Sequence, residues 1–400
     1  MNLQAVLNAL SVGDPVSGTE LAERIAAHPS TITRLTGLLE EAGLIREKPQ
    51  DELPATGTVG RPPKVWALDA AAGYAVGLAL TATLGRGVLV DLTGRVLARK
   101  DREFDPPLRA AAVAGAVRDL VSRLTPGVDP GAIVGVGVGI TGIIDPGTGA
   151  MRVSGGLLDG DGRPAVNYPL GEALEGALPW PVRVGNDANL GALAAFRRLV
   201  RRGELAPDGS LYYLLAVDSL WGFGSGIVIG GELYAGSAGA AGETVHPSLS
   251  SWEPNWRDLP VRALKGEPAA ISEVTRYLTP VLDHFAALAL TLDTSCVVLG
   301  GALSRLGEPI VHAFRDALRA AFVFEDLIGQ PLVNTIKLDS LWPDTVSLGA
   351  ADLVLDSLFP VPSLGEPGPL VRRVLDRQAA LSAAAEPPRR AYVYSHRGSV

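Results

Sequence analysis

Two groups of polar residues in this 400-residue chain have types and spacings that could do chemistry. Near the N-terminus, hydroxyl, imidazole and guanidinium groups gather at the start of one expected helix: His28, Ser30, Thr31, Thr33 and Arg34. Such donors suit base edges and backbone phosphates of DNA. Much later, Glu243 and His246 follow a run of Gly and Ala. A carboxylate accepts hydrogen bonds and an imidazole can donate or accept one, so this pair could bind a polar ligand.

The first group lies in a segment with three short helical patterns followed by two strand patterns. In the helices we expect these side chains to face inward: Leu3, Val6, Leu7 and Leu10, then Leu21, Ala22 and Ile25, then Ile32, Leu35, Leu38 and Leu39. The expected helices around residues 19–26 and 30–41 are joined by a tight turn, and Gly43 ends the second one. Strands are expected at 44–46 and 64–68. This order predicts a winged helix-turn-helix over residues 1–69, with a wing and linker at about 46–64.

In such a module the second helix of the pair enters the major groove, and its N-terminal residues contact the DNA. Arg61, between Gly60 and Pro62, is an extended Arg that could enter a narrow minor groove, although a plain linker role is equally open. Residues 1–69 hold nine acidic and six basic residues, so their electrostatic signal for DNA is weak. A module for protein contacts is therefore the alternative. We favour DNA on the order of the elements.

Composition excludes several classes of protein. With 47% hydrophobic and 20% charged residues the chain is globular, and a net charge of −8 argues against a wholly basic nucleic-acid binder. A single cysteine, Cys296, excludes a disulfide framework and any zinc site built on paired cysteines. The apolar runs at 70–84 and 131–144 are short and rich in Gly and Thr, and no signal peptide is apparent. We therefore expect a cytoplasmic protein without a membrane partner.

From residue 73 to about 375, strand patterns alternate with helical ones, which predicts an α/β body. The expected strands are 74–80, 87–90, 96–98, 133–140, 182–184, 212–217, 227–229 and 296–299, and the expected helices are 109–124, 187–200, 272–292 and 307–321. The run 133–140 has the composition of a parallel strand buried on both faces. Residues 376–400 are expected to form a flexible tail.

Several segments of the body carry a family resemblance: VRVGNDAN at 182–189, GSAGAAGETVH at 236–246, VGVGVGITGIID at 134–145, VVLGGA at 297–302 and LGAA at 348–351. Together with the N-terminal module, they resemble transcriptional regulators of the ROK family over about residues 15–358. The resemblance implies an actin-like or hexokinase-like fold of two α/β lobes. The smaller lobe would span about 73–185 plus a helix at about 346–358, and the larger lobe about 186–345.

The resemblance also implies roles for individual residues. Asp187 stands where the family's sugar kinases have the general base, and Asn186 would hold a neighbouring sugar hydroxyl. Glu243 and His246 would contact further hydroxyls, and Thr141 and Gly142 would bring backbone close to the sugar. A purely structural alternative for Asp187 is that it caps the helix that follows. Gly185 and Val245 depart from the family pattern, which has Glu and Gly there.

Other departures concern the phosphate-binding loops of the kinases. The first, D-x-G-G-T in the family, aligns with Ala79, Leu80, Thr81, Ala82 and Thr83; the second, GTGIGxG, aligns with the run from Leu220 and Trp221 to Gly226. The loss of the Asp, of both first-loop glycines and of the Thr argues against ATP turnover. The family's cysteines after the His are also missing. We therefore expect no enzyme activity, no ATP, no zinc and no other metal.

These observations predict a sugar-responsive repressor with a degenerate sugar-kinase-like body. Its expected partners are double-stranded operator DNA and a sugar or sugar phosphate, and the resemblance implies a homodimer or a dimer of dimers. Two alternatives stay open. One is an active ROK-type sugar kinase that carries a winged helix, and the other is a regulator whose pocket binds a non-sugar ligand or none.

Overall fold

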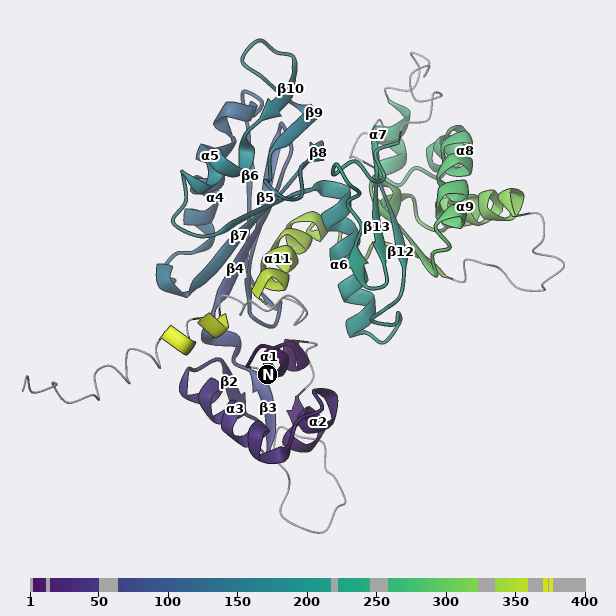
Figure 1. Cartoon of the computed structure of the whole chain (residues 1–400). Coiled ribbons are helices and arrows are strands. Elements are labelled where there is room, and N and C mark those ends of the chain that lie inside the picture. Colours follow the sequence, from purple (N-terminus) through teal and green to yellow (C-terminus); the bar gives the residue numbers. More distant parts are fainter. Residues whose placement is uncertain are drawn as a thin grey trace, which may run out of the picture. The chain divides into compact units, whose positions relative to one another are not determined.

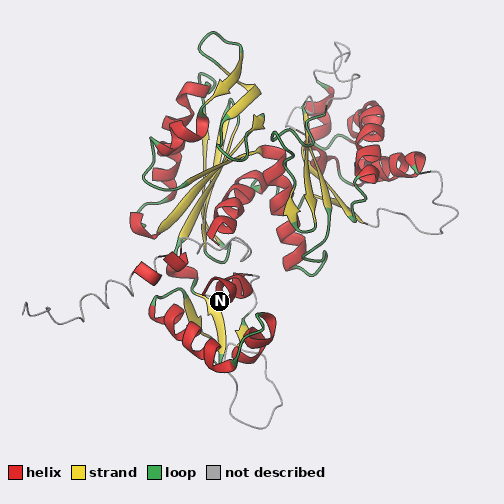
Figure 2. Cartoon of the chain, in the orientation of Figure 1, coloured by secondary structure: helices red, strands yellow, loops and turns green. Residues whose placement is uncertain are grey.

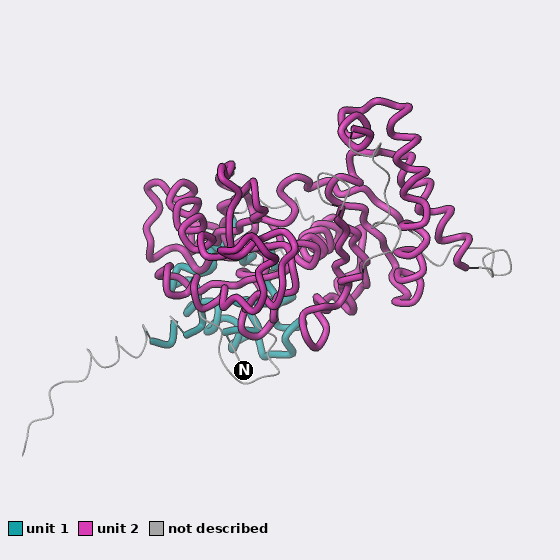
Figure 3. The backbone as a smooth tube through the Cα atoms, turned by 90° about the horizontal axis from the view of Figure 1, so that it is seen from above, with its two compact units in different colours: residues 1–69, 357–400 teal, residues 70–356 magenta. Residues whose placement is uncertain are grey.

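The computed structural model describes residues 3–11, 15–49, 64–216, 222–244, 258–322, 335–358, 370–372 and 374–376. The chain divides into two compact units, coloured separately in Figure 3. One comprises Met1–Asp69 together with Ser357–Val400, and the other comprises Ala70–Asp356. The sequence placed the end of the body at residue 375, whereas the structure groups the residues from Ser357 onward with the N-terminal ones.

The N-terminal segment forms three helices and a small sheet (Figure 1). The elements are α1 (Leu3–Ser11), β1 (Val16–Ser17), α2 (Gly18–Arg24), α3 (Pro29–Glu41), β2 (Ile45–Glu47) and β3 (Val65–Leu68). The strands are antiparallel in the order β1-β3-β2. Helix α2 starts at a capping box, in which Ser17 Oγ accepts from the Glu20 amide and Glu20 accepts from the Ser17 amide.

The helical faces of this unit follow the predicted spacing with two exceptions. All four apolar residues predicted to face inward on α1 are buried. On α3, Thr36 is buried where we expected Leu38, which is half-buried. The Thr36 hydroxyl can lie inside because it donates to the carbonyl of Ile32. On α2 only Leu21 is buried, because the helix ends at Arg24 and residue 25 already lies in the turn.

The smaller lobe of the second unit is built on a five-stranded sheet in the order β11-β7-β4-β5-β6. Its strands are β4 (Tyr74–Leu80), β5 (Leu84–Asp91), β6 (Val96–Glu103), β7 (Ile133–Ile140) and β11 (Val182–Asn186). Every residue of β7 is buried and the strand is parallel, as predicted. Its parallel partners are β4 and β11. Helices α4 (Val113–Leu124) and α5 (Leu170–Glu175) contribute buried side chains to the core of this lobe.

A second, three-stranded sheet of the smaller lobe was not predicted. It has the order β10-β9-β8 and contains β8 (Ile143–Ile144), β9 (Met151–Leu158) and β10 (Pro164–Tyr168). The glycine pair at 155 and 156 interrupts the alternating pattern of β9, so the sequence signal for a strand was weak. The short 3-10 helices are η2 (Ala70–Ala72), η3 (Ala110–Ala112), η4 (Pro130–Ala132) and η7 (Ala302–Leu306).

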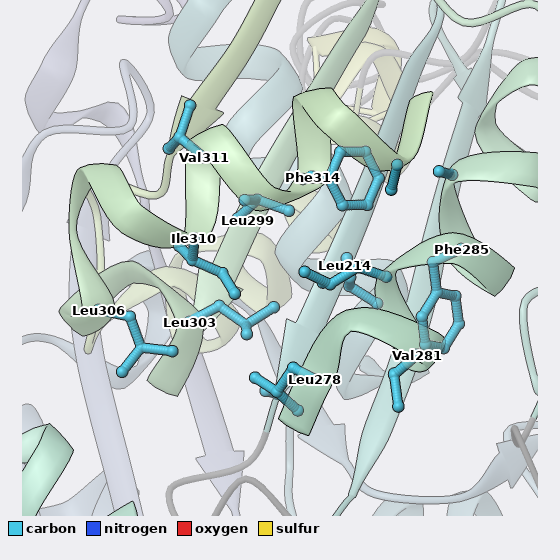
Figure 4. Close-up of a cluster of buried hydrophobic side chains, with 14 of the residues drawn as sticks. Leu214, Leu278, Val281, Phe285, Leu299, Leu303, Leu306, Ile310, Val311 and Phe314 are labelled. Atoms are coloured by element: carbon cyan, nitrogen blue, oxygen red, sulfur yellow. The ribbon is translucent and has the colours of Figure 1, made fainter. Parts of the chain in front are cut away.

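The larger lobe has another five-stranded sheet, in the order β14-β13-β12-β15-β16. The strands are β12 (Leu211–Ala216), β13 (Phe223–Ile229), β14 (Glu232–Leu233), β15 (Cys296–Gly301) and β16 (Thr335–Leu338), and the helices are α6 (Asp187–Arg201), α7 (Leu259–Leu264), α8 (Pro268–Thr291) and α9 (Glu308–Ala321). Figure 2 shows the helices in red and the strands in yellow. Phe285 of α8 and Phe314 of α9 pack in the core drawn in Figure 4, with Leu214 of β12. None of the helices in the described residues is long and apolar enough to cross a membrane.

Helix α11 (Thr345–Leu358) packs against the sheet of the smaller lobe through glycines. A Cβ on Gly137 would lie 1.9 Å from the Ala350 carbonyl oxygen, so only glycine permits this approach. On its other side, Gly349 meets α6 in the same way, because a Cβ there would lie 1.9 Å from the Leu190 carbonyl oxygen. Two ion pairs, Arg197 with Asp356 and Arg201 with Asp352, also join α6 to α11.

Candidate functional site

The candidate site begins where β11 ends and α6 starts. Asn186 is the N-cap of α6, and its Oδ1 accepts from the Asn189 amide at 3.0 Å. Its Nδ2 donates to the Gly142 carbonyl at 3.0 Å and to Glu243 Oε1 at 2.9 Å. All its amide hydrogens and its oxygen thus have protein partners. The alternative that Asp187 caps the helix is wrong, because Asn186 occupies the cap and Asp187 is the first helical residue.

Asp187 lies on the wall of a cavity and is half-buried. Its Oδ2 accepts from Thr141 Oγ1 at 2.8 Å, and its Oδ1 accepts from the Ala188 amide at 2.9 Å. Desolvation by the surrounding protein raises the pKa of Asp187, and the two hydrogen bonds counter only part of that rise. A carboxylate with a raised pKa at a cavity wall is chemically suited to accept a proton from a ligand hydroxyl.

Thr141 and Gly142 stand just after the carboxyl end of β7 and are held by the unpredicted sheet. Ser154 of β9 is fully buried, and its Oγ donates to the Thr141 carbonyl at 2.6 Å. Gly142 has a φ of +127°, and a Cβ on it would lie 2.3 Å from the Val153 carbonyl oxygen. This close packing fixes the loop, so the Thr141 hydroxyl faces Asp187 and the Gly142 carbonyl faces Asn186.

Glu243 approaches from the larger lobe, on the segment that follows β14. Gly242 packs on β13 with a φ of +82°, and a Cβ there would lie 2.1 Å from the Ser225 carbonyl oxygen. Gly239 makes a similar contact with the Ile144 carbonyl of the smaller lobe. The glycines therefore bring Glu243 to Asn186. Partial desolvation, followed by the negative charge of Asp187, raises the pKa of Glu243, which keeps much of its surface exposed.

These residues surround a cavity of about 190 Å³ between the two lobes. Thr141, Gly142, Asn186, Asp187 and Glu243, all singled out from the sequence, line it together. Gly222, Phe223 and Gly224 of the lining belong to the run that aligns with the second phosphate loop, and Ile143 belongs to the resemblance segment 134–145. The sequence did not single out the rest of the lining: Val153, Gly155 and Leu215. These are apolar residues or glycines, so their types gave no chemical signal. Ser154, the support of Thr141, could have been found only with the position of β9 known.

A second, smaller cavity of about 90 Å³ shares Thr141, Asp187 and Leu215 with the first. It is lined by the turn that joins β4 to β5, where the family's kinases have their first phosphate loop. Here the turn closes on itself, because Thr81 Oγ1 accepts from the amides of Thr83 and Leu84 and donates to the Leu84 carbonyl. Arg86 on β5 donates to Asp101 through Nε and Nη2 and to the Pro343 carbonyl through Nη1.

Several predicted residues lie outside the described part of the chain: Arg61, Leu220, Trp221 and His246. Among the described residues, no group of three or more His, Cys, Asp and Glu side chains could hold a metal ion.

The N-terminal part of α3 presents the other group of predicted residues. His28 is the N-cap, and its Nδ1 lies 2.8 Å from Ser30 Oγ and accepts from the Ser30 amide. Thr33 is exposed and donates to the Pro29 carbonyl, and Thr31 is half-buried. Arg34 is exposed and has no hydrogen bond or ion pair with any residue that the structure describes. The start of α3 therefore carries hydroxyls and one available guanidinium on its outer surface.

Comparison with known proteins begins with the family. Residues 75–256 match the model of the ROK family. They include every residue that lines the cavity of about 190 Å³. The chain contains a ROK family domain. Curated relatives include the xylose repressors of Caldicellulosiruptor bescii, 25% identical over 252 residues, and Bacillus subtilis, 22% identical over 255 residues. Each match covers 62% of this chain, and 59% and 60% of those proteins respectively.

A further relative of the ROK domain is the DNA-binding transcriptional dual regulator NagC of Escherichia coli, 25% identical over 251 residues, or 62% of this chain and 57% of NagC. The aligned stretch thus spans less than two thirds of the length of these curated relatives. Among solved structures, a ROK family transcriptional regulator described as a homologue of the E. coli MLC protein has a TM-score of 0.65 at 17% identity. It covers 94% of this chain and 98% of its own.

A ROK family glucokinase from Streptomyces griseus, solved with glucose and AMPPNP, has a TM-score of 0.54 at 23% identity. The match covers 70% of this chain and 99% of the glucokinase. At these identities both solved structures show the fold alone, which is the mixed α/β sheet fold of the hexokinase-like kinases.

Proposed function

We propose that this chain is a sugar-responsive transcriptional repressor. The observation that carries the proposal is that one chain contains two parts of this kind. The first is a helical unit in which α3 begins with exposed polar side chains, and the second is a ROK domain with a cavity lined by polar groups. Three relatives are named for repression or transcriptional control, two of them for xylose. These names agree with a DNA-binding unit and a sugar-binding domain in one chain.

The first unit acts as a winged helix-turn-helix, with α2 and α3 as the helix pair. Helix α3 enters the major groove, and the side chains at its start contact DNA: His28, Ser30, Thr31, Thr33 and Arg34. Arg61, in the expected wing, would add a minor-groove contact. A homodimer, or a dimer of dimers, would present two such helices to the half-sites of a near-palindromic operator.

The cavity between the lobes is the effector site. Its 190 Å³ exceeds the roughly 150 Å³ of a protein cavity known to hold benzene, so a six-membered sugar ring fits its scale. Asp187 and Glu243 supply carboxylate oxygens for sugar hydroxyls, and His246 would supply a further contact. Asn186 acts by placing Glu243, because both of its amide hydrogens already have protein partners.

A repressor needs no ATP turnover, and the turn of residues 81–84 supports its absence. A phosphate loop offers free backbone amides to phosphate oxygens. Here the amides of Thr83 and Leu84 are taken by Thr81 Oγ1, and the Thr81 amide donates to the Leu84 carbonyl. Asp187 is the observation that favours the second candidate, a sugar kinase, because a carboxylate on the cavity wall is the kind of group that a general base requires.

The test is binding of the purified chain to DNA upstream of its own gene, with and without sugars and sugar phosphates, at one stated salt concentration. We expect specific binding that one sugar weakens. Glu243→Ala should remove this response and leave DNA binding intact, whereas Glu232→Ala, an exposed carboxylate on β14, should change neither. Sugar-independent DNA binding would contradict the effector site. Phosphorylation of a sugar by ATP that Asp187→Asn abolishes would establish the kinase instead.

A further inference from the structure

The two cavities of the ROK domain meet at one wall. Thr141, Asp187 and Leu215 line both of them, so a ligand group attached beside the Asp187 carboxylate can extend from the larger cavity into the smaller one. We propose that the effector is a monosaccharide that carries a short alkyl group on the oxygen beside Asp187, such as an alkyl glycoside or sugar ether. This inference rests on the proposed sugar site and names the class of sugar that the site takes.

The hydroxyl, guanidinium and carboxylate groups that line the smaller cavity are already bonded within the protein. Thr81 Oγ1 makes three hydrogen bonds inside its own turn. Thr141 Oγ1 donates to Asp187, and Asp187 also accepts from the Ala188 amide. Arg86 holds Asp101 through two nitrogens and the Pro343 carbonyl through the third. A polar ligand group in this space would have to break these bonds or stay unpaired.

The remaining lining of the smaller cavity is apolar. It comes from hydrocarbon side chains, two residues without polar side-chain atoms and one indole ring: Ala79, Leu80, Leu84, Leu215, Val346, Gly139, Pro343 and Trp342. Leu80, Leu215 and Val346 are buried aliphatic residues, so the surface that they offer is suited to a hydrocarbon group. At about 90 Å³ the space is well below the roughly 150 Å³ that holds a benzene ring, so it admits a short alkyl chain and excludes a ring.

The charges beside the cavity disfavour a phosphate in the same place. A phosphate in the smaller cavity would lie beside the Asp187 carboxylate, and the two negative charges would repel each other. Arg86 is the one described cation in the lining, and its charge is neutralised by Asp101 in a side-on pair. An alkyl group carries no charge, so it needs no cation and is not repelled by Asp187. Its burial raises the affinity of the ligand by about fourfold for each methylene removed from water.

The experiment is calorimetric titration of the full chain with matched ligand series. The probes are glucose, galactose, mannose and xylose, each as the free sugar, the methyl and ethyl glycosides of both anomers, and the phosphate, with 6-O-methyl ethers of the hexoses. We expect one alkylated sugar to bind roughly fourfold or more tightly than its parent, and the phosphate more weakly than both. A phosphate or free sugar that binds best overturns this proposal and leaves the sugar site standing. If no member binds, both fail.

Two variants of opposite effect test the smaller cavity directly. Ala79→Leu should fill it, so that alkylated and free sugars bind equally while affinity for the free sugar is kept. Leu84→Ala should enlarge it and move the preference from methyl toward longer alkyl groups. Neither residue lines the larger cavity. Thermal melting of both variants checks that they fold. An alkyl preference that both folded variants leave unchanged would place the alkyl group elsewhere and refute the proposal.

Discussion

Asn186 Nδ2 donates to Glu243 Oε1 at 2.9 Å, which ties the start of α6 to the segment after β14. The same amide donates to the Gly142 carbonyl, and its oxygen caps α6. One side chain thus sets the position of three parts of the cavity wall. Because none of its hydrogen-bonding atoms is left over, its role in the site is to position other groups rather than to hold the ligand.

Replacing Asn186 should therefore cost stability as well as ligand binding. Asn186→Ala removes the N-cap of α6 and leaves the Gly142 carbonyl without its side-chain donor, so we expect a loss of about 2 kcal/mol in unfolding free energy. Asn186→Asp keeps a capping oxygen but sets a carboxylate beside Glu243. It should retain more stability than the alanine variant and still lose the effector response. Thermal melting and sugar titration measure the two effects, and equal melting temperatures for Asn186→Ala and the parent would contradict this role.

The α6–α11 contact should make stability depend on pH. Burial raises the pKa of Asp352 from 3.8 to about 6. The positive charges of Arg201 and Arg197 lower this pKa in part, and the negative charge of Asp356 raises it further. The folded protein thus binds this proton more tightly than the unfolded chain. The contribution of Asp352 to the unfolding free energy is therefore greatest below about pH 4. It falls by at most about 3 kcal/mol as the pH rises to about 6.

The check is the difference in melting temperature between the parent and Asp352→Asn, followed from about pH 4 to pH 7. The parent should lose stability relative to the variant across this range and then run parallel to it. A constant difference at all pH values would show that Asp352 titrates normally.

Glycine 349 should tolerate no side chain. A Cβ there would lie 1.9 Å from the Leu190 carbonyl oxygen, a backbone atom that cannot rotate away. We expect Gly349→Ala to lower unfolding free energy by about 1–3 kcal/mol. Gly115, within α4, is the matched control, since a Cβ on it meets nothing within 4 Å. Gly115→Ala should stabilise by up to about 1 kcal/mol through helix propensity. Chemical denaturation of both variants tests the pair.

Arg34 should carry part of the proposed DNA contact. Arg34→Ala should weaken DNA binding about tenfold or more, and if the contact is to phosphate it should reduce the salt dependence by about one unit of slope. Arg183→Ala, at the exposed position of β11, removes the same charge from the chain and should leave DNA binding unchanged. Titrations at several salt concentrations separate the two. Equal losses for both variants would mean that net charge alone is responsible.

Long and strongly patterned elements could be predicted from the sequence. The apolar run of β7 predicts a strand that is buried on both faces, because every one of its side chains avoids water. The spacing of Val6 and Leu7 in α1 predicts a helix that buries one face. The strands β8 to β10 could not be found in this way. Two of them are short or interrupted by glycine, so their pairing depends on tertiary contacts that no local pattern encodes.

The candidate site shows the same division. Asp187 and Glu243 could be found because they stand in segments that resemble the ROK family, VRVGNDAN and GSAGAAGETVH. The cap at Asn186 could not, since Asn and Asp are equally good caps and stand side by side. The register of β11 on β7, which pairs Asn186 with Ile140, decides between them. Val153 and Leu215 of the cavity wall look like any core residue in sequence.

The first unit contains both ends of the chain, with Met1–Asp69 and Ser357–Val400 in one compact body. Gln4 Nε2 donates to the Leu358 carbonyl at 3.3 Å, and Leu358, Leu370 and Val371 are buried. In topological terms, the ROK domain is an insertion between two segments of its host. A fragment cut at Asp69 would therefore lack part of its own interior. A ligand that changes the separation of residues 70 and 356 would act on two attachment points of the host at once, so it would strain that domain internally as well as displace it.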